Sequence, residues 1–288
     1  YSNQYSSYTE LRLHENRLLN ISLLNGDIVS NMQDTNGGVS ARVFDKGAWG
    51  FSSNPNATND CIETTISAAT RNAEFLAKRS GNPELSLPRS LASANSNSNT
   101  KKPRKSQDEI IAFLKSIDAY ISEHCPDIVS RQLALNCLDM EKKLQTSEGS
   151  MGHNTNSRAI ISVKLTTRNE AGDPIELSEG IGDRGQFEDV FESPERIHKA
   201  VDELYKHLMN KKTAVKPVSG YHDVILASDL AGILAHEAIG HTTEADIVRE
   251  GSIAGDYLGE RVASDLVTLI DFANSHNGET LPMPIYMD

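Results

Sequence analysis

The chain has few cysteines and no long apolar run. Its three cysteines, Cys61, Cys125 and Cys137, are an odd number with no CxxC spacing, which argues against a disulfide framework and against a zinc ribbon. No stretch approaches the ~18 apolar residues that a membrane span needs, and the N-terminus has neither the basic start nor the apolar core of a signal peptide. These absences predict a soluble, cytoplasmic protein without a membrane partner.

Positive charge is scarce as well. The 288 residues include 28 lysines and arginines against 40 aspartates and glutamates, a formal net charge of -12. Such a field repels phosphate backbones, so the composition predicts no nucleic-acid partner. The short basic run Lys101–Lys105 has no interleaved aromatic residue and is interpreted as a solvated linker.

Short β-leaning runs and one amphipathic helix fill the first 88 residues. Turn formers at Asn25–Asp27 and Asn36–Gly38 separate the runs. The predicted strands are Tyr8–Leu13, Leu18–Leu24, Gly38–Phe44 and Ala48–Ser52. Apolar residues at steps of four and three then predict a helix, whose stripe runs from Ile62 to Leu76 and which ends at Ser80–Gly81.

A similar pattern of strands and helices follows from residue 106 onward. Ser106 and Glu109 form a capping-box pattern at the start of a helix whose apolar stripe runs through Ile110–Ile121. The predicted strands are Ile128–Leu138, Ala159–Thr167 and Ile175–Ile181. Ser193, followed by Pro194 at the first helical position, predicts another helix start. The buried face of that helix is predicted to be Ile197, Val201, Leu204 and Leu208. The predicted class is α+β (mixed α/β), with antiparallel-rich sheets and packed helices.

Composition divides the chain into four predicted segments. Residues 93–100 are small and polar and bury too little apolar surface to offset their ordering entropy. We therefore expect a strand-plus-helix segment at 1–88, a mobile linker at 89–106 and a second strand-and-helix segment at 107–217. Residues 218–288 are expected to begin a catalytic segment that is incomplete. The reason is that the final residues, 281–288, stop in mid-strand without a terminating cap.

A helix near residue 236 carries many ligand-type side chains. We expect Val224–Leu226 to be a buried strand and Ser228 to cap the helix that follows it. Eleven residues of this helix include two imidazoles and three carboxylates, namely His236, Glu237, His241, Glu244 and Asp246. Because unpaired charge is costly to bury, a metal ion is the usual way to satisfy such a group.

The motif His-Glu-x-x-x-His is one residue longer than the familiar HExxH. Helical residues four apart differ by about 40° in azimuth and share a face, whereas residues five apart differ by about 140°. If His236 and His241 bind one ion, the helix must be distorted between them. We expect a π-type or broken turn there, with Gly240 tolerating the strain. The alternative is a plain hydrogen-bonded stripe on one helix face, formed by Glu237, His241 and Glu244.

Two sequence blocks in this region are distinctive. The first is His236–His241 followed by Glu244–Asp246, and the second is Gly259–Asp271, with the sequence Gly-Glu-Arg-Val-Ala-Ser-Asp-Leu-Val-Thr-Leu-Ile-Asp. Together they resemble the TldD branch of the TldD/PmbA family of zinc metallopeptidases. The strands and Ala-rich helix at 8–79 resemble the family's first segment more weakly. The resemblance extends across most of the chain and is sharp from about residue 224 to 271.

This resemblance implies a role for each polar residue of the motif. His236 and His241 would be ligands of one Zn²⁺ ion, and Glu237 would be the general base that activates the metal-bound water. Glu244 and Asp246 would orient the imidazoles, with Glu244 as a direct ligand being the lesser alternative. The resemblance thus implies a metallopeptidase subunit that hydrolyses unfolded or extended peptides.

The chain departs from the family in one respect. Members of this branch take a third metal ligand from a cysteine in the C-terminal region, whereas all three cysteines here precede the motif. The family also implies a partner: a PmbA-type subunit without the motif, or a separate C-terminal chain, that helps to enclose a peptide. Two alternatives stay open, a non-catalytic scaffold half-chain and a related enzyme that matures peptides by cleaving a C–N bond.

Overall fold

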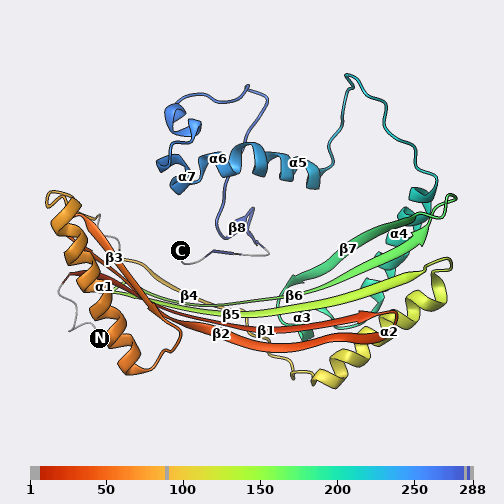
Figure 1. Cartoon of the computed structure of the whole chain (residues 1–288), viewed down its shortest axis with the longest axis horizontal. Helices are drawn as coiled ribbons and strands as arrows, with labels where there is room; N and C mark the ends of the chain where they lie inside the picture. Colours follow the sequence, from red (N-terminus) through yellow and green to blue (C-terminus); the bar gives the residue numbers. More distant parts are fainter. Residues whose placement is uncertain (1–6, 88–90, 282–283, 286–288) are drawn as a thin grey trace. The chain divides into compact units, whose positions relative to one another are not determined.

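The structure is a computed structural model that describes residues 7–87, 91–281 and 284–285. The chain divides into two compact units (Figure 1). We call Tyr1–Ala214 together with Ala273–Asp288 the sheet unit, and Val215–Phe272 the motif unit. The predicted mid-strand ending at 281–288 lies mostly outside the described residues.

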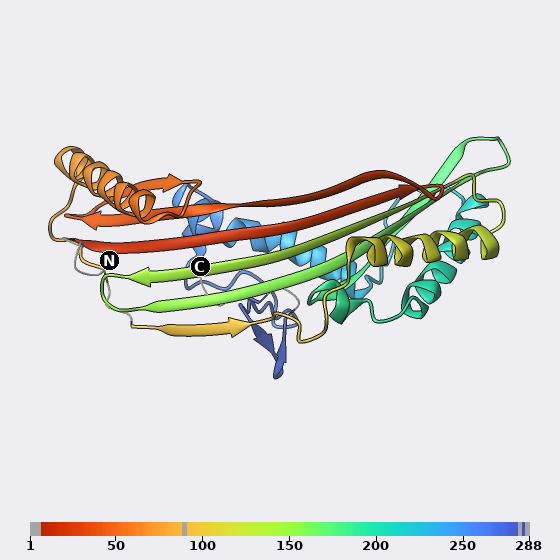
Figure 2. The same cartoon turned by 90° about the horizontal axis from the view of Figure 1, so that it is seen from below.

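The described part of the sheet unit is built on one seven-stranded sheet of long strands (Figure 2). The strand order is β3-β2-β1-β5-β6-β4, with β7 also paired to β6. The strands are β1 (Tyr8–Leu24), β2 (Asp27–Asp45), β3 (Ala48–Asn54), β4 (Ser93–Asn97), β5 (Ser130–Thr146), β6 (Met151–Arg168) and β7 (Pro174–Arg184). Apart from the parallel pair β4–β6, neighbouring strands are antiparallel, which confirms the predicted mixed α/β class with an antiparallel-rich sheet. A separate hairpin pairs β8 (Ser275–His276) with β9 (Glu279–Thr280).

The predicted turn at Asn36–Gly38 is wrong, because β2 continues straight through it. A Cβ atom on Gly37 would lie 2.1 Å from the carbonyl oxygen of His14, and one on Gly38 would lie 2.2 Å from that of Asn54. These glycines therefore allow neighbouring strands to approach closely. They do not reverse the chain.

The described helices of the sheet unit pack on one face of the sheet. They are α1 (Asn59–Ser80), α2 (Gln107–His124), α3 (Phe187–Val190) and α4 (Glu195–Lys212). Leu11 of β1 packs in the cluster beneath α1, whereas Ile21 and Leu23 of the same strand pack in the cluster beneath α2 and α4. Because side chains alternate along a strand, these odd-numbered positions share one face and the even-numbered positions of β1 lie on the other. We call that second face the helix-free face.

Local signals predicted these helices well. The capping box at Ser106 and Glu109 is present, Gly81 caps the end of α1, and the face of α4 predicted to be buried is buried. The first residue of α4 is Glu195, one position beyond the predicted start at Pro194.

The segment around the basic run is not an unpacked linker, at least from residue 91 onward; residues 89–90 lie outside the described part. Ser93–Asn97 form the parallel strand β4 on the edge of β6. The guanidinium of Arg104 lies 3.2 Å from the carboxylate of Glu188, whose side chain is only 3% exposed. The Lys105 backbone N–H also donates to Glu188. A nearly buried carboxylate needs such partners, and this need explains why the basic run lies against it.

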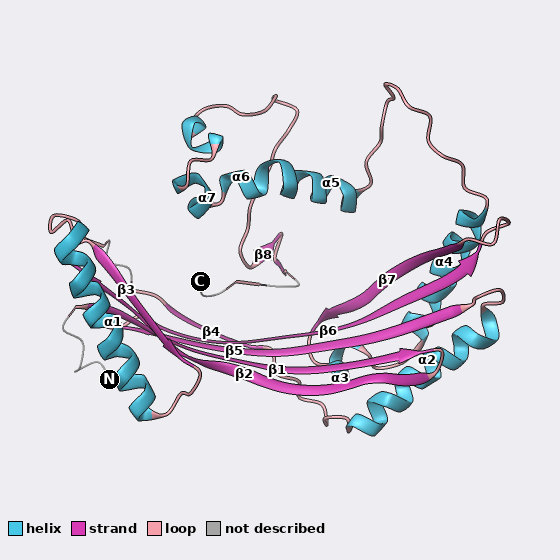
Figure 3. Cartoon of the chain, viewed as in Figure 1, coloured by secondary structure: helices cyan, strands magenta, loops and turns pink. Residues whose placement is uncertain are grey.

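The motif unit consists of short helices joined by loops (Figure 3), and none of its residues is buried in a core. It contains α5 (Ser228–Ala235), the π-helical turn η2 (His236–Gly240), α6 (His241–Thr243), α7 (Ala245–Arg249) and the 3-10 turn η3 (Ile253–Tyr257). None of residues 215–272 is buried. The predicted buried strand at Val224–Leu226 is wrong: these residues are irregular, and Ile225 is 99% exposed. Ser228 is the first helical residue, and the N-cap position is Ala227, which provides no side-chain cap.

Among the described residues, no helix combines the length and apolar character needed to cross a membrane.

Replacing Gly50 by alanine is expected to lower the free energy of unfolding by about 3 kcal/mol, the upper end of ordinary overpacking effects. A Cβ at this position would lie 2.1 Å from the Ala69 carbonyl oxygen and 2.2 Å from the Ala73 nitrogen, so α1 would have to move off β3. Urea denaturation measures the loss. Gly180→Ala is the control, because its Cβ would meet only a side-chain atom of Ile160 at 4.0 Å. Equal losses in the two variants would contradict this account.

Candidate metal site

The helix that carries the motif changes its hydrogen-bonding pattern at the motif itself. Residues His236–Gly240 form a π-helical turn between α5 and α6. The backbone N–H of His241 donates to the carbonyl of His236, five residues earlier, which is the bond that defines a π-turn. The distortion predicted from the five-residue spacing is thus confirmed.

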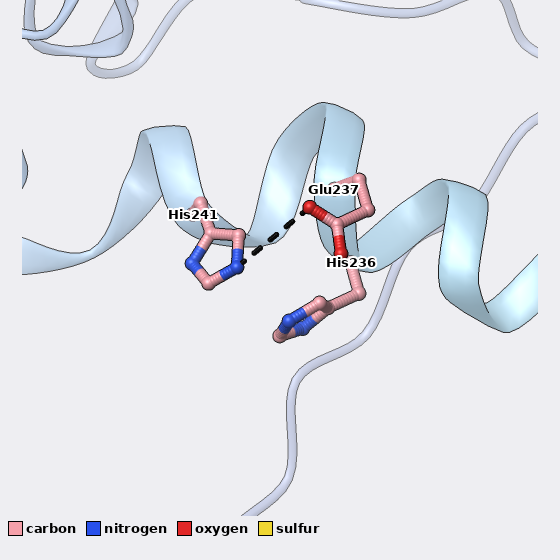
Figure 4. Close-up of side chains that lie close together, drawn as sticks. All are labelled: His236, Glu237 and His241. Carbon is pink, nitrogen blue, oxygen red and sulfur yellow. Dashed lines mark ion pairs between the residues drawn. The ribbon is translucent and has the colours of Figure 1, made fainter.

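The π-turn brings the two imidazoles together on one side of the helix (Figure 4). The ring centroids of His236 and His241 are 4.3 Å apart, with an interplanar angle of 64°. One ligand atom from each of His236, Glu237 and His241 can be chosen so that all three lie within 4.8 Å of one another. Two imidazoles and a carboxylate are a donor set that zinc accepts, so the chemistry of these residues fits a zinc ion.

Two carboxylates contact the His241 ring from different sides. Its Nδ1 lies 2.6 Å from Oε1 of Glu244, and its Nε2 lies 3.9 Å from Oε2 of Glu237. A carboxylate on one ring nitrogen fixes the tautomer of the imidazole and orients the other nitrogen to bind a metal ion. Asp246 is not part of this group: it lies in α7, and its carboxylate accepts the backbone N–H of Ile247.

These contacts also form the hydrogen-bonded stripe considered as the alternative. Glu237, His241 and Glu244 do lie along one face of the helix. The stripe needs only an ordinary helix, however, since its members are four and three residues apart. It gives no reason for the π-turn or for the approach of His236 to His241.

Gly240 does not have the role that the spacing suggested. Its backbone angles, φ −51° and ψ −61°, are ordinary helical values that any residue adopts. A Cβ there would lie 3.6 Å from Nδ1 of His236. The glycine therefore leaves room beside the His236 ring, and the turn does not depend on glycine's conformational freedom.

The site is open to solvent. The side chains of Glu237 and His241 are 65% and 48% exposed. Catalytic zinc sites usually combine three protein ligands with a water-excluding surround. The motif unit supplies His236, Glu237 and His241, but no residue of the same unit covers them.

The three cysteines lie in the sheet unit, in α1, at the end of α2 and in β5. Burial raises the pKa of the Cys125 thiol to about 11 and that of the Cys137 thiol to about 12. Since thiolates and not thiols bind zinc, these environments disfavour Cys125 and Cys137 as metal ligands at neutral pH.

A thiol titration tests this assignment. At pH 8 the folded chain is expected to release rapidly only the single equivalent of thionitrobenzoate that Cys61 supplies, because the raised pKa values of the buried Cys125 and the half-buried Cys137 keep both thiols protonated. Denaturant should raise the total to three equivalents, one for each cysteine. Rapid release of three equivalents by the native chain would contradict the raised pKa values of these two thiols.

Comparison with known proteins identifies the family of this chain. Residues 9–73 match PmbA/TldA metallopeptidase domain 1, residues 101–208 match the central domain, and residues 219–283 match the C-terminal domain of the same family. The chain belongs to the TldD/PmbA family. The motif unit therefore falls in the part that matches the C-terminal domain.

Several relatives of this family member are named metalloproteases. A metalloprotease of Methanocaldococcus jannaschii is 27% identical over 272 residues, which are 94% of this chain and 59% of the relative. A zinc metalloprotease TldD homolog of Saccharolobus solfataricus is 27% identical over 217 residues, 75% of this chain and 46% of the relative. The chain spans about half the length of the curated relatives it matches.

Solved structures confirm the fold at low sequence identity. A Bacteroides thetaiotaomicron protein, named as a proposed modulator of DNA gyrase, has a TM-score of 0.65 at 15% identity, over 92% of this chain and 60% of its own. TldE from Thermococcus kodakarensis has a TM-score of 0.50 at 12% identity, over 73% of this chain and 45% of its own.

Proposed function

We propose that this TldD/PmbA chain carries the zinc-binding helix of a metallopeptidase that hydrolyses unfolded or extended peptides. The observation that carries the proposal is the π-turn at His236–Gly240, which places the imidazoles of His236 and His241 4.3 Å apart. The metalloprotease names of the relatives support the same reading.

In this proposal each polar residue of the motif has a distinct task. His236 and His241 hold the ion through ring nitrogens, and Glu244 orients His241 through the 2.6 Å contact at Nδ1. When bound, zinc supplies a Lewis acid that makes a water molecule more acidic and polarises a peptide carbonyl. Glu237, beside the His241 ring, accepts the proton of the attacking water and returns it to the leaving amine.

The proposed enzyme works as an assembly. The exposed apolar side chains of the motif unit, such as Ile225 and Leu266 at 99% and 95% exposure, need a surface to cover them. We infer that a PmbA-type subunit, or a further C-terminal chain, supplies this cover and completes the zinc ligands. The fold shared with TldE of T. kodakarensis is compatible with a partner of similar architecture.

Metal content is the measurement that tests the proposal. The chain is purified alone and with its companion subunit, and zinc is counted by mass spectrometry. About one zinc per chain is expected in the assembly, and His236→Ala and His241→Ala should both remove it. His222→Ala is the control, because this histidine of the same unit contacts the Val218 carbonyl and is not part of the His236, Glu237 and His241 group. Absence of zinc under both conditions would favour the scaffold alternative.

A further inference from the structure

The strand β2 is paired on both sides over only part of its length. Its neighbour β3 pairs with it from Asp45 back to Val39, which lies opposite Asn54. Within the described part of the chain, residues 27–37 of β2 therefore pair with β1 alone (Figure 2). All of these residues are exposed. We call residues 27–37 the free edge of β2.

The sequence after β3 explains why this edge is left free. Asn54 is followed by Pro55, and proline has no backbone N–H with which to continue a strand ladder. The chain then leaves the sheet and begins α1, with Thr58 as the N-cap. The space beside the free edge is thus available to a strand from elsewhere.

The other outer strands of the sheet are protected, as exposed edges in natural proteins usually are. Lys211 and Arg196 of α4 donate to two backbone carbonyl oxygens of β7, at 3.0 and 3.2 Å. Asn72 of α1 donates to the Phe51 carbonyl oxygen of β3 at 2.8 Å. The remaining outer strand, β4, is only five residues long.

The free edge of β2 has none of these protections. No side chain of the described residues forms a hydrogen bond with its backbone. It contains no proline, lysine or arginine, and Ile28, Val29 and Met32 have exposed apolar side chains. In an antiparallel pair, alternate residues direct their N–H and C=O groups away from the partner strand. The free edge is therefore a template for one more strand.

The charge of the free edge indicates which kind of strand it fits. Its ionisable side chains, Asp27 and Asp34, are both acidic. Asp34 is contacted by the amide of Asn36 at 3.4 Å, and no cation of the described residues pairs with it. A lysine or arginine opposite Asp34 would therefore meet an uncompensated carboxylate. A second copy of this chain would bring the same acids and a net charge of -12, which disfavours self-pairing.

A hollow of about 310 Å³ lies where β3 leaves the sheet. Residues 35–38 of β2 line it on one side, and residues 55–57 line it on another. A strand added antiparallel to β2 has the direction of β3 and begins beside residue 37. The hollow therefore offers space for the first side chain of such a strand.

We propose that the free edge of β2 binds an extended peptide with basic side chains, which joins the sheet as an antiparallel strand. Backbone hydrogen bonds supply affinity that tolerates many sequences, and a lysine or arginine opposite Asp34 supplies a preference. That this peptide is a substrate of the peptidase rests on the proposed function; the strand-binding edge itself does not.

Fluorescence anisotropy with the full chain in metal-free buffer tests the proposal. The probe is a labelled, capped peptide of threonine and valine, about ten residues long, with a lysine at its centre. Two further forms carry N-methyl groups on alternate backbone nitrogens, one form for each edge of the peptide. One form should bind like the parent peptide, and the other should bind at least about tenfold more weakly, because only one edge of the peptide faces β2.

A charge exchange tests the role of Asp34. Replacing the central lysine of the peptide by glutamate should weaken binding about tenfold. Asp34→Asn should remove this preference for lysine. Glu179→Gln is the matched control, because it neutralises an exposed carboxylate on the protected strand β7 and should retain the preference. Thermal unfolding checks that both variants are folded.

Amide hydrogen exchange locates the bound peptide. Residues 27–37 should exchange more slowly when the peptide is present, and β7 should be unchanged. Equal effects of the two methylation patterns, an unchanged lysine preference in folded Asp34→Asn, or protection only outside β2 would each overturn the proposal. A dimer that the peptide does not dissociate, seen by sedimentation, would assign the edge to a second copy instead. Because no metal is present, failure of the zinc site leaves this result unaffected, and failure here leaves the zinc site standing.

Discussion

Glu237→Gln is expected to lower peptide turnover by about 10²–10⁴-fold, the usual contribution of a positioned acid or base. The amide has nearly the same shape as the carboxylate but cannot take a proton from water. Zinc content should stay near that of the unchanged assembly, since the imidazoles of His236 and His241 remain. The measurement is steady-state cleavage of an unfolded peptide by the zinc-loaded assembly, with metal counted in the same sample.

The zinc count distinguishes two roles for Glu237. Its carboxylate is close enough to the imidazoles to be a ligand, so loss of zinc together with activity would assign it to the ion. Unchanged turnover at full zinc content would exclude it as the base. Glu250→Gln, a neutralised carboxylate at the C-cap of α7, is the control and should retain both turnover and zinc.

Gly240→Val is expected to weaken zinc binding by about 10–100-fold, as loss of support around metal ligands commonly does. The Cβ of valine would lie 3.6 Å from Nδ1 of His236, so its two methyl groups would crowd that ring. Gly240→Ala should have a much smaller effect, because the added Cβ alone makes an ordinary contact. Competition with a chromogenic zinc chelator measures the affinities.

A matched substitution in the same helix separates crowding from helix propensity. Gly232 lies in α5, and a Cβ there would have no neighbour within 4 Å. Gly232→Val therefore introduces the same β-branched residue without touching the imidazoles, and it should leave zinc affinity unchanged. If both valine variants weaken binding equally, the effect comes from the helix as a whole and the local account fails.

Sequence reasoning succeeded where a feature depends on neighbours along the chain. The capping box of α2 involves residues three positions apart, and the buried stripe of α4 follows from its 3.6-residue period. The π-turn was predictable for the same reason: two histidines five positions apart converge only if the helix adds a residue to one turn.

Sequence reasoning failed where the local structure depends on residues that are distant in the chain but close in the fold. Asn36–Gly38 has the composition of a turn, but close approach to β1 and β3 is what requires its glycines. Lys101–Lys105 is exposed, as its interpretation as a solvated linker predicted, but its backbone is also held: the Lys105 N–H donates to the nearly buried Glu188, 83 positions away in the chain. Val224–Leu226 has the composition of a buried strand, but no other part of the motif unit packs over it and its side chains are exposed.

Short-range spacing along the chain was enough to predict the amphipathic helices, the antiparallel class, the family resemblance and the distorted turn at the motif. Which charged side chains lie close together depends instead on the pairing of distant strands. Arg12, His14 and Lys142 are more than a hundred residues apart at their extremes, and none stands out in the sequence. They line one pocket on the helix-free face because the register of β1 against β5 pairs His14 with Lys142, and a shift of one residue would send one of these side chains to the opposite face of the sheet.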